Sequence, residues 1–175
     1  VEADYSGAPS GRTHSSPKGL IPHPPLCMES GTFARSRDTA CAMSRENVKT
    51  VQRTMEAINR GNVEAAVSYT DSDGELHSAI IGGTEGNVYR GHDGLRRWYA
   101  DVMETFEELS TEFTEYRDLG DRIVAFGHIH ARGRGSGLEI DSPTGWVFTL
   151  RRGKVVRAEG FLDPAEALET AGLRE

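Results

Sequence analysis

The stretch that decides the fold is Tyr89-Arg90-Gly91-His92-Asp93-Gly94-Leu95, where a short predicted strand leads into a helix start. Before it, a predicted helix pair ends in the Asp-rich turn 71–74, and residues 75–81 predict a strand. After it, a long helix and several strands run to Phe161-Leu162-Asp163-Pro164. This order predicts an α+β fold. A cone-shaped, curved and antiparallel-rich sheet wraps around three helices, with a pocket inside and a short C-terminal helix.

Apolar residues recur at helical spacing in the two longer predicted helices. The first runs from about Arg45 to Arg60, with Ser44 as its N-cap and Gly61 as its stop. Its apolar stripe is Val48, Val51, Met55 and Ile58. The helix that begins near His92 has a wider buried face, formed by Leu95, Trp98, Tyr99, Val102, Met103, Phe106 and Leu109.

The second half of the chain alternates as strands do. Strands are predicted at 111–118 and 122–132, followed by a hairpin of 145–151 and 155–162 around Arg152-Gly153-Lys154. Pro164 opens a last short helix over 165–170.

Bulk composition excludes several classes of protein. With 175 residues, 37% of them apolar, the chain has room for one domain. A net charge of −7 argues against nucleic-acid binding, which needs a basic face. No apolar run approaches the roughly 20 residues of a membrane helix. The two cysteines, Cys27 and Cys41, precede the predicted fold, so no disulfide framework is expected and the cytoplasm is the expected compartment.

Residues 1–42 differ in kind from residues 43–175. They hold prolines, Ser and Gly without an apolar period, and they predict a disordered extension before a single folded domain. The extension is open to three interpretations: a functional arm, a targeting segment, or a consequence of start-codon choice. Because Met43 directly precedes the predicted first cap, our hypothesis is that Met43 is the natural start.

The order of elements resembles the SnoaL-like branch of the nuclear transport factor 2-like superfamily. The motifs that carry the resemblance are the helix pair around Arg60-Gly61-Asn62, the segment 89–95, the glycine run 133–137, Trp146-Val147-Phe148, and 159–163 before Ala165-Glu166-Ala167-Leu168. The resemblance covers residues 44–173. It implies a cone of helices against a curved sheet with an apolar cavity, often as a homodimer. The superfamily includes polyketide cyclases, ketosteroid isomerases and non-catalytic members.

Asp163 is the first candidate for catalysis, because SnoaL-like cyclases place an acidic general acid/base near the end of a late strand. Desolvation at a cavity wall would raise the pKa of such a carboxyl toward a useful range. The competing interpretation is an N-cap, since Asp before Pro at the first helical position is a favoured arrangement.

Histidines supply the second group of candidates. His128 and His130 share one strand face with Val124 and Phe126, so either could move a proton if that face lines the cavity. His77 shares a face with Glu75 on the first strand after the helix pair. A metal site is not expected, because no carboxylate follows at a ligand spacing. The alternative is one packed and one solvated histidine.

Candidate substrate contacts are mostly aromatic. Glu159 pairs in sequence with Arg157, either inside the cavity or as a structural ion pair on the outer face. The other candidates are Trp98, Tyr99, Phe126, Trp146, Phe148 and Phe161, of which two or three are expected to line the pocket and the rest to form core.

Two functions remain open from the sequence. The first is a general acid/base enzyme, cyclase- or isomerase-like, that uses no cofactor and acts on an apolar carbonyl or polycyclic ring compound. The second is a non-catalytic small-molecule-binding or dimerisation module. An enzyme requires Asp163 or His128 to face the cavity, whereas a binding module requires an apolar lining with those groups turned out.

Overall fold

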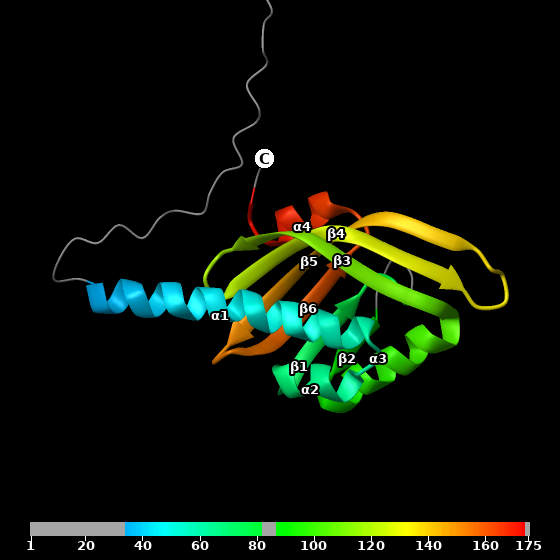
Figure 1. Ribbon diagram of the computed structural model, residues 1–175, viewed down its shortest axis with the longest axis horizontal. Coiled ribbons are helices and arrows are strands. Elements are labelled where there is room, and N and C mark those ends of the chain that lie inside the picture. Colours follow the sequence, from blue (N-terminus) through cyan, green and yellow to red (C-terminus); the bar gives the residue numbers. More distant parts are fainter. Residues whose placement is uncertain (1–33, 82–86, 174–175) are drawn as a thin grey trace, which may run out of the picture.

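The computed structural model describes residues 34–81 and 87–173 as four helices and one six-stranded sheet (Figure 1). The elements in chain order are α1 (Ala34–Asn59), α2 (Val63–Tyr69), β1 (Thr70–Ser78), β2 (Asn87–Arg90), α3 (Gly91–Thr105), β3 (Phe106–Asp118), β4 (Arg122–Gly133), β5 (Glu139–Arg151), β6 (Lys154–Phe161) and α4 (Pro164–Thr170). Within these described residues, no helix combines the length and apolar character needed to cross a membrane.

The sheet has the strand order β2-β1-β6-β5-β4-β3. Only β1 and β6 pair in parallel, and every other neighbouring pair is antiparallel. Helices α1, α2 and α3 cover one side of the sheet and α4 lies on the other (Figure 1). The predicted α+β fold, with its curved antiparallel-rich sheet and short last helix, is confirmed.

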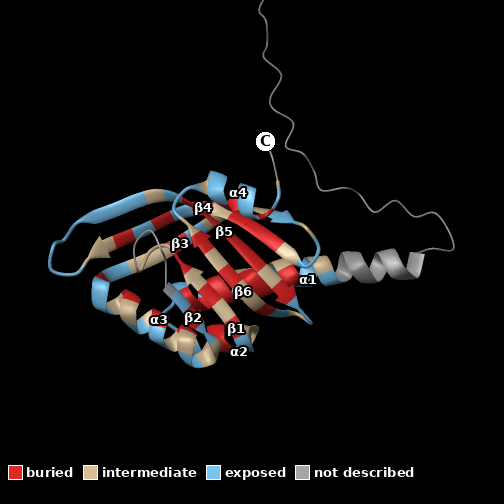
Figure 2. Ribbon diagram, turned by 180° about the vertical axis from the view of Figure 1, so that it is seen from behind, coloured by how far each residue is buried: buried red, intermediate tan, exposed pale blue. Residues whose placement is uncertain are grey.

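Two apolar layers result from this arrangement, one on each side of the sheet. The larger core lies between α1–α3 and the concave face, and it includes Trp98, Trp146 and Phe148. The smaller core lies between α4 and the convex face, and it includes Val124 and Val147. Figure 2 shows buried residues along the middle strands of the sheet, between these two layers.

Helix α1 begins at Ala34, earlier than the predicted start at Arg45, so Ser44 lies inside the helix. Residues 34–43 contain neither Pro nor Gly, and nothing in their sequence breaks a helix. The helix therefore takes in residues 34–42, which the sequence assigned to the extension, and this part reaches beyond the sheet (Figure 1). Residues 1–33 lie outside the described part, and a start at Met43 stays a prediction.

Strand β1 begins at Thr70, so the predicted turn at 71–74 lies within the strand. It forms an irregularity, because the register with β6 shifts between Thr70 and Glu75. The amide of Asp73 donates to Asp71 Oδ1 at 3.1 Å, which is the local hydrogen bond that also makes Asp favourable in turns. The turn signal thus marks a bulge.

The long helix α3 ends at Thr105, so Phe106 and Leu109, predicted on its buried face, belong to β3. Arg134 closes this end of the helix. Its amide donates to the carbonyl of Thr105 at 2.9 Å, and its guanidinium donates to the carbonyls of Met103 and Phe106 at 3.0 and 3.3 Å. A cation at a helix C-terminus satisfies free carbonyls and opposes the helix dipole.

The β5–β6 hairpin turns at Arg152 and Gly153, which both have positive φ values of 54° and 72°, as a type I′ turn requires. Just beyond it, β6 carries one extra residue. Thr149 pairs with Arg157 and Leu150 with Val155, which leaves Val156 as a bulge. Val155 and Ala158 consequently both face the helices.

Candidate functional site

A cavity lies between the helices and the concave face of the sheet, with a volume of ≈ 40 Å³. Its walls come from α1, β1, β2, α3, β5 and β6. Most of the lining side chains are apolar (Met55, Ile58, Leu76, Leu95, Trp98, Trp146, Phe148, Val155 and Ala158), and Thr54, Thr70 and Tyr89 also line the cavity. Glu75 also borders the cavity, but its carboxylate is engaged in ion pairs on the convex face. The cavity is therefore an apolar environment.

Trp146 and Phe148 form a stacked pair in the cavity wall, with ring centroids 5.7 Å apart and planes at 14°. Gly160 of β6 makes room for this pair, because a Cβ on Gly160 would lie 2.6 Å from Trp146 Cζ2. Trp98 approaches from α3, and its Nε1 donates to Ser78 Oγ at 3.1 Å. Trp146 Nε1, in contrast, has no acceptor among the described residues.

The volume of the cavity limits what it can hold. A cavity of about 150 Å³ accommodates benzene, and pockets for drug-sized ligands measure roughly 300–1,000 Å³. At ≈ 40 Å³, the cavity is smaller than either, so a bound molecule requires movement of its walls. The unbranched side chain of Met55 is the most adaptable part of that wall.

The structure places Asp163 outside the cavity, at the start of α4. Its Oδ1 accepts a hydrogen bond from the Ala165 amide at 2.9 Å, Pro164 follows at the first helical position, and the side chain is exposed. This is the N-cap geometry that the sequence offered as the alternative to catalysis.

His128 and His130 lie on the convex face. They share that face with Val124 and Phe126, as predicted, and both are exposed. Their Nδ1 atoms lie 3.0 and 3.4 Å from the two carboxylate oxygens of Asp141 on β5. The hydrogen bond from His128 lowers the pKa of the Asp141 carboxyl below its ordinary value. Neither histidine reaches the cavity, because the sheet lies between.

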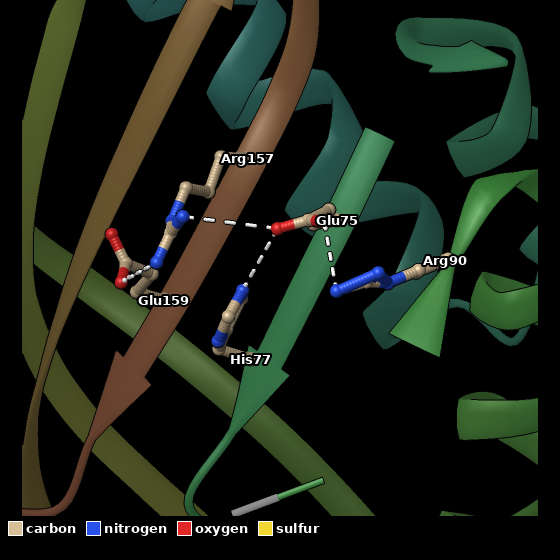
Figure 3. Close-up of polar contacts among 5 residues, drawn as sticks. All are labelled: Glu75, His77, Arg90, Arg157 and Glu159. Carbon is tan, nitrogen blue, oxygen red and sulfur yellow. Dashed lines mark hydrogen bonds and ion pairs between the residues drawn. The ribbon is translucent and has the colours of Figure 1, made fainter. Parts of the chain in front are cut away.

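His77 and Glu159 belong to a network of ion pairs on the convex face of β1, β2 and β6 (Figure 3). Arg157 Nη2 donates to Glu159 Oε1 at 2.8 Å, and its Nη1 lies 3.7 Å from Glu75 Oε2. His77 Nε2 lies 3.2 Å from the same Glu75 oxygen, and Arg90 Nη2 lies 3.2 Å from Glu75 Oε1. Arg157 and Glu159 thus form the outer-face ion pair that the sequence offered as one of two alternatives.

These contacts favour the charged forms of Glu75 and Arg157. The hydrogen bond from His77 lowers the pKa of Glu75, against the opposing effect of burial, and the charges of Arg90 and Arg157 lower it further. The hydrogen bond to Glu159 raises the pKa of Arg157. Within the described part of the chain, no group of three or more His, Cys, Asp or Glu is arranged to hold a metal ion.

The six aromatic candidates divide between the two faces of the sheet. Trp98, Trp146 and Phe148 line the cavity. Phe126 and Phe161 pack instead against the smaller core between α4 and the convex face. Tyr99 packs beside the larger core without lining the cavity. The strands carry apolar residues on both faces. Alternation of apolar and polar residues in the sequence therefore could not separate the aromatic residues of the cavity from those on the opposite face.

Several residues of the cavity wall were not singled out as candidates. Met55 and Ile58 belong to the predicted stripe of the first helix, so their inward orientation was readable. Leu76 and Ala158 pair side by side in the sheet. Ala158 carried no usable signal, because the bulge at Val156 changes the phase of its strand.

The comparisons with known proteins agree with this fold. The model of the SnoaL-like domain matches residues 51–158, so the chain belongs to the SnoaL-like domain family, a branch of the nuclear transport factor 2-like superfamily. No curated protein matches the chain.

Three solved structures illustrate the likeness. TerC, crystallised with polyporic acid, is 23% identical, with a TM-score of 0.61 over 71% of this chain and 96% of TerC. A putative polyketide cyclase from Xanthomonas campestris pv. campestris is 19% identical, with a TM-score of 0.60 over 71% and 95%. A protein with a ketosteroid isomerase-like fold from Catenulispora acidiphila, in complex with trimethylamine, is 17% identical, with a TM-score of 0.59 over 71% and 93%. At these identities the likeness concerns the fold.

Proposed function

We propose that this SnoaL-like domain binds a small apolar molecule in the cavity between its helices and its sheet, and that it acts as a binding module. The observation that carries the proposal is the chemical contrast between the two faces of the sheet. The cavity is walled by apolar side chains, whereas Asp163, His128 and His77 lie across the sheet from it. A proton carrier for a bound molecule would have to share the cavity with it.

Two structural neighbours support the binding of small molecules by this fold. TerC was crystallised with polyporic acid, and the protein from Catenulispora acidiphila was solved with trimethylamine. The volume of ≈ 40 Å³ favours a ligand at the smaller end of that range.

The test is a thermal-shift series on the full chain with molecules of increasing size: cyclopentane, benzene, indole and anthraquinone. A ligand at 100 times its dissociation constant stabilises by about 2.7 kcal/mol, which is readily measured. We expect stabilisation by the small rings and none by anthraquinone. If no apolar molecule stabilises the protein, the proposal is wrong.

A pair of variants ties binding to the cavity. Ala158→Val adds two methyl groups to the cavity wall and should abolish the stabilisation by cyclopentane. Ala100→Val makes the same chemical change at an exposed position of α3 and should leave it intact. Equal binding by both variants would place the ligand elsewhere.

A second candidate function is the acid/base enzyme. The observation that favours it is the His77–Glu75 pair at 3.2 Å, which holds an imidazole beside a carboxylate on the convex face. The test is elimination of 5-nitrobenzisoxazole, a general probe of proton abstraction, by the wild type and by His77→Gln. Turnover that requires His77 supports a cofactor-independent enzyme. Turnover equal to that of buffer excludes this role for the pair.

We also propose that two copies pair as a homodimer and that the protein works in the cytoplasm. The homodimer follows from the family resemblance, and the cytoplasmic location follows from the sparse use of cysteine. Light scattering of the purified full chain tests the first, and fractionation of host cells tests the second.

A further inference from the structure

The pairing of the sheet is interrupted in the wall of the cavity, at residues 71–74 of β1, which we call the β1 bulge. β1 pairs with β6 at Thr70 and again from Glu75, so residues 71–74 lie opposite Val156 alone. Val156 is itself the extra residue of β6 relative to β5. On its other side, β1 pairs with β2 only from Glu75 onward. The β1 bulge therefore lies outside the regular ladder on both sides.

The β1 bulge separates the cavity from solvent. Ser72 and Asp73 are exposed, whereas Gly74 is buried and lines the cavity. The backbone of the bulge rests on Gly91, which begins α3 and also lines the cavity. A Cβ on Gly91 would lie 2.8 Å from the carbonyl oxygen of Ser72. At this point the wall is a single layer of backbone.

Both ends of the β1 bulge are firmly held. At the first end, His92 Nε2 donates to the Thr70 carbonyl at 3.0 Å, and Thr70 Oγ1 donates to the Ala66 carbonyl at 3.1 Å. At the second end, Glu75 is fixed by its ion pairs with three neighbours on the convex face (Figure 3). Movement of the bulge would therefore be confined to the residues between these two anchors.

The middle of the β1 bulge is held more weakly, through the carboxylate of Asp71. The amide of Asp73 donates to Asp71 Oδ1 at 3.1 Å, and Arg151 Nη2 lies 3.7 Å from Asp71 Oδ2. The Arg151 side chain is 66% exposed, so this ion pair contributes little to stability. A short segment with firm ends and a weakly held middle is able to open locally without unfolding of the whole domain.

The rest of the cavity wall is held by regular secondary structure. Of the described residues that line the cavity, Gly74 alone lies neither in a helix nor at a paired position of a strand. A volume of ≈ 40 Å³ means that binding requires movement of the wall. The β1 bulge is the part of the wall whose movement breaks the fewest regular backbone contacts.

We propose that the β1 bulge is the gate of the cavity. Residues 71–74 move away from Gly91, admit a small apolar molecule and close over it, and Asp71 is the side chain that holds the gate shut. This inference rests on the proposed function, because it names the route by which the ligand of the same cavity enters and leaves.

The experiment is an NMR titration of the full chain, labelled with nitrogen-15, with benzene and with cyclopentane. Both tryptophans of the chain line the cavity, so their indole N–H signals report its occupancy, and the exchange broadening gives the rates of association and dissociation. Asp71→Ala removes both contacts of the gate and should raise both rates about fivefold. The affinity should stay unchanged, because the lost contacts do not touch the bound molecule.

The matched control is Asp121→Ala, which makes the same change at an exposed position of the turn between β3 and β4. Its two rates should equal those of wild type. Hydrogen exchange without ligand gives a second readout on wild type itself. The Gly74 amide should exchange by local opening, much faster than the amide of Ala158 in the central strand β6.

The outcomes separate the gate from the proposed function. If the probes bind but Asp71→Ala leaves both rates unchanged, the inference is wrong while the binding function stands. Exchange of Gly74 as slow as that of Ala158 would also overturn the gate, because the bulge would then open only by global unfolding. If neither benzene nor cyclopentane changes the indole signals, the binding function fails and the gate with it.

Discussion

The side-chain amide of Asn59 forms both hydrogen bonds of a strand neighbour with the backbone of Thr111. Asn59 Nδ2 donates to the Thr111 carbonyl at 2.8 Å, and the Thr111 amide donates to Asn59 Oδ1 at 3.0 Å. Strand β3 is an edge of the sheet, and Thr111 pairs on its other side with Ile129 of β4. The last residue of α1 thus completes the backbone pairing of an edge strand at one position, which also limits pairing with other chains.

Replacing Asn59 by Ala should lower the free energy of unfolding. Both Thr111 backbone groups lose their partners, and each lost hydrogen bond of this kind costs about 1 kcal/mol, so a loss of about 1–2 kcal/mol is expected. Urea unfolding measures it, and faster hydrogen exchange at the Thr111 amide localises it. Arg60→Ala, at the exposed neighbouring position, should change stability little. An unchanged exchange rate at Thr111 would contradict the role of Asn59.

Asp163 acts as a helix cap, and two substitutions separate this role from a role in proton transfer. Asp163→Ala removes the acceptor of the Ala165 amide and should cost about 1 kcal/mol. Asp163→Asn keeps an acceptor at the same place and should be close to wild type in stability. Thermal unfolding of the three proteins checks this, and a large loss in the Asn variant would contradict capping.

Gly160 should not tolerate a side chain. Gly160→Ala places a Cβ 2.6 Å from Trp146 Cζ2, and relief of that contact requires the ring or the strand to move, with an expected cost of about 1–3 kcal/mol. In a Trp146→Phe background the ring is smaller and the cost should fall. A double-mutant cycle by urea unfolding measures the coupling. Additive costs would mean that the two residues do not interact.

Stability should depend on pH through Glu75, whose pKa is lowered by His77, Arg90 and Arg157. A carboxyl with a folded-state pKa below its unfolded value binds its proton more readily when unfolded. Its contribution is therefore fully present above the ordinary carboxyl pKa, and it is lost as the pH falls through the lowered folded-state pKa. The stability difference between wild type and Glu75→Gln should be present at about pH 5.3, roughly one unit above the ordinary carboxyl pKa of about 4.3, and should shrink as the pH falls below it.

The matched control for this pH series is Glu169→Gln, at an exposed position of α4. It should leave the pH profile of unfolding close to that of wild type. Below about pH 4, where carboxyl groups titrate, the stability of wild type should fall more steeply than that of Glu75→Gln. Equal slopes would show that the ion pairs do not favour the charged carboxylate.

Much of the fold was predictable because local signals agree with tertiary structure. Gly91 and Asp93 mark the start of α3, Arg152 and Gly153 form the hairpin turn, and Asp163 caps α4. The site was less predictable. Strands β4 and β5 are apolar on both faces, since α4 covers part of the convex side. Phe126 and Phe148 therefore look alike in sequence, although they lie on opposite faces.

The start of α1 and the bulge in β1 were missed for a different reason. The signals for a cap at Ser44 and a turn at Asp71 are real local preferences, but both are weak. A continuous helix without breakers and a pairing with β6 outweigh them.

The single extra residue at Val156 decides which chemistry each side of β6 presents. Strict alternation from Val155, which faces the cavity, would direct Arg157 and Glu159 inward and Ala158 outward. Two charges would then occupy the enclosed side and an alanine the solvent side. The division of this protein into an apolar interior and a charged exterior therefore depends on the length of one strand segment as well as on its composition. In this chain, deletion of one residue at that point would exchange the inward and outward faces of the rest of β6.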